Sequence, residues 1–255
     1  MENNMTYENI LLTIENSIAH IRLNRPAKRN AVNNGLLQDL EACFDSLGSD
    51  ATVVVLSGEG EHFSAGLDLS EHQVRSPFEV LQHSQWWHEV FQKIQFGGRP
   101  VVSALHGAVV GGGLELATST HVRVADKSAF FQLPEGQRGI FLGGGGSVRI
   151  PKLIGLPLVQ DLMLTGRTLS AQEGLVAGAS QYLVDDGEGF AKAMELARKA
   201  AGNARMTNFA IINALPQISE SNPASGFFTE ALMAAIAETT PEAQQRLRDF
   251  LEKRA

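Results

Sequence analysis

The chain has 255 residues, a net charge of −7 and 44% hydrophobic residues. This length suits one large domain or a core with an appendage, and the hydrophobic content argues against disorder. The acidic balance argues against a nucleic-acid partner, because phosphate binding needs clustered Lys and Arg. The single cysteine, Cys43, excludes an intrachain disulfide and favours a cytoplasmic location. With no long apolar run and no secretory signal pattern, we expect no membrane partner.

The first sixty residues predict a hairpin, a helix and a buried strand. Ile10–Glu15 and Ile18–Leu23 are rich in β-forming residues and are separated by two polar residues, which is typical of a hairpin. Apolar residues recur at helical spacing over Leu36–Leu47. Thr52–Ser57 is a continuous apolar run, as in a strand that is buried on both faces.

The middle of the chain alternates between helix and strand patterns. Helices are predicted over Pro77–Gln95 and after each of two glycine runs, and Ser170 begins a capping box for another. Strands are predicted at the following places: Pro100–Leu105, His121–Ala125, the stretch near Phe130, and Ser180–Val184. This alternation predicts an α/β core over residues 1–186.

The last quarter of the chain shows only helical patterns. The predicted helices are Glu188–Gly202, Thr207–Ile218, Gly226–Ala237 and Pro241–Lys253. No low-complexity linker precedes them. We therefore expect a helical region over residues 187–255 that packs on the core or on a neighbouring subunit.

Glycine is the compositional outlier, with 25 residues, seven of which form the runs Gly111–Gly113 and Gly143–Gly146. Neither run has the spacing of a dinucleotide fingerprint, and no Gly-Lys pair supplies a phosphate-binding loop. The serine-hydrolase elbow and the H-E-x-x-H zinc motif are absent from the sequence. The histidines show no metal-ligand spacing, so we expect no metal site.

A glycine run before a helix exposes N–H groups that can stabilise a developing oxyanion. Glu115 follows the first run among apolar residues, which predicts a raised pKa suited to acid–base chemistry. Glu135 lies shortly before the second run, and two carboxylates can share one water. The same patterns also fit packing turns and a glutamate that interacts only with the helix dipole, so residue patterns alone leave both interpretations open.

Four segments occur in an order that resembles the enoyl-CoA hydratase (crotonase) superfamily. They are Ile21–Pro26 with Asn30–Val32, Phe63–Leu69, His106–Leu116, and Pro134-Glu135 followed by Gly143. The resemblance implies an α/β, crotonase-like spiral of ββα units with a C-terminal helical region, assembled as a homotrimer or a dimer of trimers. It implies an acyl-CoA substrate and no cofactor beyond the coenzyme A of that substrate.

The resemblance also implies roles for individual residues. The N–H groups of Leu67 and Gly112 would form an oxyanion hole for the thioester oxygen, Glu115 would activate water, and Glu135 would protonate the α-carbon. The backbone of Gly143–Gly146 would crowd the acyl pocket beside Glu135. The substrate and CoA contacts would come from the following residues: Arg25, Ala27, Lys28, Arg29, Ala65, Gly66, Asp68, Leu69, Gly111, Pro134, Gly143, Phe250 and Lys253. A solvated basic turn at residues 25–29 and a helix-packing role for Phe250 remain as alternatives.

Three further segments resemble the methylthioacryloyl-CoA hydratase branch of this superfamily. They are His83–His88, Leu133–Phe141 and Thr207–Ala210. They predict hydration of methylthioacryloyl-CoA, in dimethylsulfoniopropionate breakdown, and of short enoyl-CoAs such as crotonyl-CoA, with thioester hydrolysis as a possible later step. The alternatives are an enoyl-CoA isomerase, a general fatty-acid enoyl-CoA hydratase and a non-catalytic RNA-binding member, which the net charge disfavours.

Overall fold

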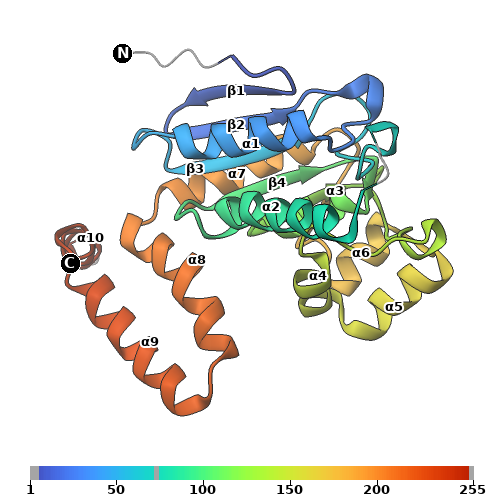
Figure 1. Cartoon of the computed structure of the whole chain (residues 1–255). Helices are drawn as coiled ribbons and strands as arrows, with labels where there is room; N and C mark the ends of the chain where they lie inside the picture. Colours follow the sequence, from blue (N-terminus) through green and yellow to red (C-terminus); the bar gives the residue numbers. More distant parts are fainter. Residues whose placement is uncertain (1–5, 72–74, 253–255) are drawn as a thin grey trace.

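A twisted six-stranded sheet forms the centre of the computed structural model, which describes residues 6–71 and 75–252 (Figure 1). Its strands, in spatial order, are β1 (Ile10–Glu15), β2 (Ile18–Leu23), β3 (Val53–Gly58), β4 (Val101–Leu105), β6 (Val122–Asp126) and β9 (Tyr182–Val184). β1 and β2 form the antiparallel hairpin that the sequence predicted, and every later pairing in the sheet is parallel. The α/β fold class is confirmed.

A second sheet of three short strands lies beside the first. It consists of β5 (Ala108–Val110), β7 (Phe130–Gln132) and β8 (Thr168–Ser170) in that order. β5 and β8 were not predicted, since β5 lies between Gly107 and Gly111 and Ser170 of β8 was assigned to a helix cap. β5 leads directly into the first glycine run, so this sheet sets where that run lies.

Helices cover both faces of the large sheet, as Figure 1 shows. α1 (Asn34–Ser46) and α2 (Pro77–Phe96) lie on one face, and α7 (Gly189–Ala201) lies on the other. Val54 and Leu56 of β3 belong to the larger hydrophobic core, while Val53 and Val55 belong to the core beside α7. β3 is therefore buried on both faces, as its continuous apolar run predicted.

The remaining helices of the first two hundred residues are short. The helices are α3 (Gly112–Thr118), α4 (Gly146–Ile154), α5 (Leu156–Thr165) and α6 (Ala171–Ala177), and the short 3₁₀ helices are η1 (Pro26–Lys28), η2 (Leu69–Glu71) and η3 (Gly136–Arg138). Of these, α3 and α6 contact the small sheet. The capping box at Ser170 is confirmed, because its hydroxyl accepts from the Glu173 N–H while the Glu173 carboxylate accepts from the Ser170 N–H.

The C-terminal helices divide into one that packs on the sheet and three that extend from it. α7 buries Ala193 and Ala197 against the sheet, although it lies beyond residue 186. α8 (Arg205–Glu220) and α9 (Pro223–Glu238) run alongside each other away from the sheet, and α10 (Pro241–Glu252) follows (Figure 1). The predicted helices are confirmed within the described residues, and Lys253 lies outside them.

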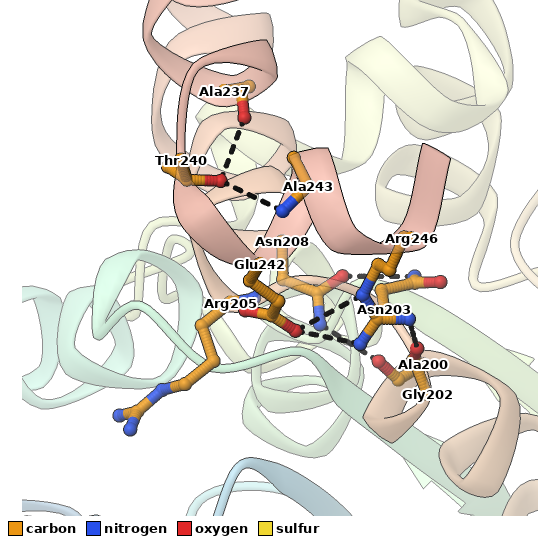
Figure 2. A network of polar contacts seen from close by, with 10 residues as sticks. All are labelled: Ala200, Gly202, Asn203, Arg205, Asn208, Ala237, Thr240, Glu242, Ala243 and Arg246. Atoms are coloured by element: carbon orange, nitrogen blue, oxygen red, sulfur yellow. Dashed lines mark hydrogen bonds and ion pairs between the residues drawn. The ribbon is translucent and has the colours of Figure 1, made fainter. Parts of the chain in front are cut away.

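A polar network joins these helices where α7 ends (Figure 2). The buried Asn208 amide donates to the Ala200 carbonyl at 2.9 Å, which satisfies an acceptor at the end of α7. Arg246 of α10 donates to the Gly202 carbonyl and pairs with Glu242 at 2.7 Å. The network therefore anchors α8 and α10 to the end of α7.

The packing of β3 predicts the effect of a truncation. Leu56 is fully buried, so Leu56→Ala should lower the free energy of unfolding by about 2–5 kcal/mol. Leu164→Ala is the matched control, because Leu164 of α5 is 82% exposed. Urea denaturation of the two variants tests this, and equal losses of stability would contradict the packing.

Candidate active site

A cavity of about 380 Å³ lies between α2, the start of α3 and the segment around the second glycine run. Leu67, Gly112, Glu115 and Glu135 all line it, together with Trp87 of α2 and apolar side chains. Four residues that the sequence singled out for chemistry are therefore brought to one space. A largely apolar cavity with a few converging polar groups is typical of a small-molecule site.

The start of α3 leaves little room for side chains, and a Cβ on Gly113 would lie only 2.5 Å from the Ser64 carbonyl oxygen. Gly111 has a φ of +51°, and a Cβ there would lie 2.6 Å from Glu135 Oε1. A Cβ on Gly112 would lie 3.0 Å from the Trp87 ring. The first glycine run therefore lets the backbone approach the side chains that line the cavity.

The N–H groups of Leu67 and Gly112 are close to each other at the cavity wall. Leu67 is held by a bridge to Val32, whose N–H donates to the Gly66 carbonyl at 2.7 Å. Gly112 is the first residue of α3, so its N–H has no acceptor inside the helix. Within the described part of the chain, neither amide donates a hydrogen bond. The pair can therefore receive one oxygen atom from a ligand.

Glu115 is a buried carboxylate with a dedicated set of donors. Its Oε1 atom accepts from the N–H groups of Gly144 and Gly146, both at 2.8 Å. Burial raises the pKa of the Glu115 carboxyl, while these two N–H groups and the charge of Arg149 act in the opposite direction. The site thus combines a dry environment with specific stabilisation of the ionised form.

Glu135 is also buried, but over residues 6–71 and 75–252 its carboxyl group lacks the donors that Glu115 has. It is 6% exposed, and its Oε2 atom is buried without a hydrogen-bond partner among the described residues. Burial raises the pKa of Glu135 to about 7, and the negative charge of Glu115 adds to this effect. Burial therefore raises the pKa of both glutamates, and they differ in that Glu115 has N–H donors and a nearby cation that favour its ionised form.

The second glycine run lies against a different glutamate from the one that the sequence suggested. We expected Gly143–Gly146 to crowd the cavity beside Glu135. Gly143 and Gly144 do line the cavity, but the N–H groups of the run point at Glu115. The contact joins segments about thirty residues apart, which no local pattern reveals.

Arg25 and Asp68, both expected to contact CoA, pair with each other. The Arg25 guanidinium lies 2.9 Å from the Asp68 carboxylate, with both side chains largely buried, and it also donates to the Ala31 carbonyl. The pair therefore ties the turn after β2 to the segment that carries Leu67.

The other expected CoA contacts that the structure describes lie outside the cavity, beside it or on its wall. Ala27, Lys28, Arg29 and Leu69 are exposed outside the cavity, and Ala65, Gly66 and Pro134 are half-buried or buried beside it. Gly111 is buried next to Glu135, and Gly143 lines the cavity. Phe250 lies on α10, is 53% exposed and does not line the cavity.

Helix α2 contributes cavity-lining residues that the sequence analysis did not identify. Trp87 lines the cavity, whereas the indole of Trp86 donates to Glu41 at 3.0 Å, so only one of the two tryptophans faces the cavity. His83 and Ser84 also line it. Helical spacing on α2 could have grouped His83, Ser84 and Trp87 on one face, but nothing in the sequence indicated what that face meets.

The described residues contain neither a metal-binding cluster nor a membrane-spanning helix. Within residues 6–71 and 75–252, no cluster of three or more His, Cys, Asp or Glu is placed to hold a metal ion. Over the same residues, no helix has the length and apolar character to cross a membrane.

Comparison with known proteins defines the class. A solved structure from Rhodopseudomonas palustris CGA009, provisionally assigned as an enoyl-CoA hydratase, is 52% identical with a TM-score of 0.95 and covers 96% of this chain and 95% of its own. The fold is thus that of the crotonase superfamily. The enoyl-CoA hydratase/isomerase family model matches residues 13–255, and the chain belongs to that family, as an enzyme of the enoyl-CoA hydratase type.

Two curated relatives show the range within the family. The short-chain-enoyl-CoA hydratase of Clostridium acetobutylicum is 30% identical, with 98% of this chain and 97% of that protein covered. The mitochondrial Δ(3,5)-Δ(2,4)-dienoyl-CoA isomerase of Rattus norvegicus is 33% identical over 71% of this chain and 60% of its own length.

The raised pKa of Glu135 predicts a pH-dependent stability. The folded-state pKa of about 7 lies above the ordinary value of 4.5, so the folded state binds more protons between these values. The contribution of Glu135 to the free energy of unfolding should therefore fall by roughly 2–4 kcal/mol as pH rises through this window. Denaturation of the wild type and Glu135→Gln from about pH 5 to pH 8 measures this difference. Glu230→Gln, on the exposed part of α9, is the control, and a flat difference for Glu135→Gln would contradict the assignment.

Proposed function

We propose that this enzyme adds water across the 2,3 double bond of an enoyl-CoA thioester. The observation that supports the proposal is the convergence of two carboxyl groups and two unpaired amides on one cavity. The thioester oxygen would accept from the Leu67 and Gly112 N–H groups, which stabilise the negative charge that forms on it during reaction. Glu115 and Glu135 would flank the double bond.

The two glutamates would then divide the proton transfers. Ionised Glu115 takes a proton from water while the water oxygen bonds to C3, and the π electrons move to give an enolate whose oxygen lies between the two amides. Protonated Glu135 delivers its proton to C2, which regenerates the thioester carbonyl. Exchange with solvent restores a proton to Glu135 and removes one from Glu115 before the next turnover.

We propose methylthioacryloyl-CoA as the main substrate, with crotonyl-CoA also accepted. The cavity volume of about 380 Å³ suits a short acyl group, and Trp87 offers an aromatic ring of the kind that divalent sulfur contacts favourably. Coenzyme A is part of the substrate, and the proposal requires no other cofactor. A methylthio-substituted hydration product could lose methanethiol, which a thiol assay would detect.

An isomerase is the second candidate, because dienoyl-CoA isomerases are among the relatives. It would move a proton between two carbons with one carboxyl group and leave water out of the product. The presence of a second carboxyl group in the cavity, with a pKa near neutrality, favours hydration. Reaction in ¹⁸O-labelled water separates the two, since only hydration places the label in the product.

We propose that the protein works in the cytoplasm as a homotrimer or a dimer of trimers. The C-terminal helices expose large apolar side chains, including Phe227 (72% exposed) and Phe228 (68%) of α9, as expected of a surface that a second copy covers. A neighbouring copy would also bring its Phe250 and Lys253 towards the CoA of this chain. Neither nucleic acid nor a membrane is a partner in this proposal.

The assembly proposal predicts a mass of three or six times 27.5 kDa in light scattering. Phe228→Asp should shift the mass towards the monomer, because it places a charge in the covered surface. Val176→Asp is the control, since Val176 of α6 is 80% exposed and lies outside these helices. A wild-type mass of one chain would overturn the proposal.

The catalytic proposal predicts that Glu115→Gln and Glu135→Gln each lower kcat for hydration by about 10²–10⁴-fold. Crotonyl-CoA and methylthioacryloyl-CoA are assayed by loss of the conjugated thioester absorbance. Glu89→Gln, on the exposed side of α2, should keep wild-type turnover. If the wild type hydrates only crotonyl-CoA, the methylthio substrate is wrong, and near-normal turnover by Glu115→Gln would overturn the mechanism.

A further inference from the structure

The segment that presents N–H groups to Glu115 is held by side chains on its other side. The Ser84 hydroxyl of α2 donates to the Gly143 carbonyl at 2.7 Å. The Arg149 guanidinium of α4 donates to the next carbonyl, that of Gly144, at 2.9 Å. Two consecutive carbonyls of a glycine run are therefore fixed by side-chain donors, in a segment whose backbone is otherwise free to adopt many conformations.

The planarity of the peptide bond connects the Ser84 contact to Glu115, while the Arg149 contact fixes the Gly144–Gly145 peptide between the two donors. The Gly143 carbonyl and the Gly144 N–H belong to one rigid plane and point in opposite directions. When Ser84 holds that carbonyl, it also aims the Gly144 N–H, which lies 2.8 Å from Glu115 Oε1. The Gly145 carbonyl, in the same plane as the Gly146 N–H, is held by the first turn of α4 through the N–H groups of Val148 and Arg149.

Both side chains are themselves braced by α2. Ser84 lies 3.4 Å from the His88 ring, one helical turn away. The Arg149 Nε donates to the Gln95 side chain at 2.6 Å, near the end of the same helix. The Ser84–His88 contact is long for a hydrogen bond and the Arg149–Gln95 contact is short, so the Arg149 side chain is held more tightly than that of Ser84.

We propose that Ser84 and Arg149 are positioning residues for Glu115, which orient the Gly143–Gly146 backbone so that two N–H groups bind the carboxylate. Arg149 also supplies a half-buried positive charge near this buried glutamate. The inference rests on the proposed function, since it assigns how the water-activating group of that reaction is kept ionised. Neither residue needs to touch the reacting atoms.

The charged and titratable groups around Glu115 determine what can be measured. Asp68, Arg75, His83 and Glu135 line the same cavity, and Arg149 of α4 acts on Glu115 from beside it. Glu115 must be ionised and so governs the acidic limb of the pH profile of kcat, whereas Glu135 must be protonated and governs the alkaline limb. Loss of a donor or a cation near Glu115 should therefore move the acidic limb more than the alkaline limb, which responds only through the coupling of the two carboxyls.

The experiment measures kcat and KM for crotonyl-CoA against pH in Ser84→Ala, Ser84→Thr, Arg149→Met and Arg149→Lys. Ser84→Ala and Arg149→Met should lower kcat about 10- to 100-fold with KM nearly unchanged, because Glu115 is misplaced. Arg149→Met should also move the acidic limb up by about one pH unit, since the ionised form loses its cation. Ser84→Thr and Arg149→Lys retain the hydroxyl and the charge, so they should recover part of the loss.

Control variants distinguish failure of the inference from failure of the proposed function. Ser219→Ala and Arg198→Met remove an exposed hydroxyl and an exposed cation on α8 and α7, and both should behave as wild type. An acidic limb that stays in place in Arg149→Met, or a loss confined to KM, would overturn the inference. If Arg149→Met fails to fold, Ser84→Ala and Arg149→Lys decide the question. A wild type that does not hydrate crotonyl-CoA would instead overturn the proposed function.

Discussion

The burial of two carboxyl groups in one apolar cavity is the constraint on which the rest of this structure depends. Two ionised carboxylates in a dry space repel each other and lose their hydration, so the chain has to distinguish them. Glu115 receives two N–H donors and faces the charge of Arg149. Glu135 has no hydrogen-bond partner for Oε2 within residues 6–71 and 75–252, and its pKa rises to about 7. The asymmetry gives one group that can accept a proton and one that can donate it.

The architecture follows from the need to bring distant segments to that cavity. The Leu67 segment follows β3 of the large sheet, and α3 follows β5 of the small sheet. Because β5 pairs with β7, Gly111 lies against Glu135. The ion pair of Arg25 with Asp68 keeps the Leu67 segment in register with the turn after β2. Helix α2 closes the cavity with Trp87 and also braces the second glycine run. Each glutamate thus lies against backbone that another part of the chain supplies.

Sequence patterns predicted the strands of the large sheet and most helices, because hydrophobic periodicity is a local signal. They also singled out Glu115 and Glu135, which the structure brings to one cavity. They missed β5, which lies between Gly107 and Gly111, and β8, whose Ser170 had been assigned to a helix cap. They also paired the second glycine run with Glu135, the nearer glutamate in sequence, whereas the backbone of that run binds Glu115. The sequence patterns did not predict the Arg25–Asp68 ion pair either, because it joins residues far apart in the chain.

Direct observation of the Glu135 carboxyl tests the division of roles most directly. Infrared difference spectra recorded against pH report a protonated carboxyl through its C=O band. The account predicts a band that is lost with a midpoint near pH 7, is absent in Glu135→Gln, and titrates at lower pH in Glu115→Gln, where the neighbouring negative charge is gone. A midpoint below about pH 5, or one that Glu115→Gln leaves in place, would contradict it.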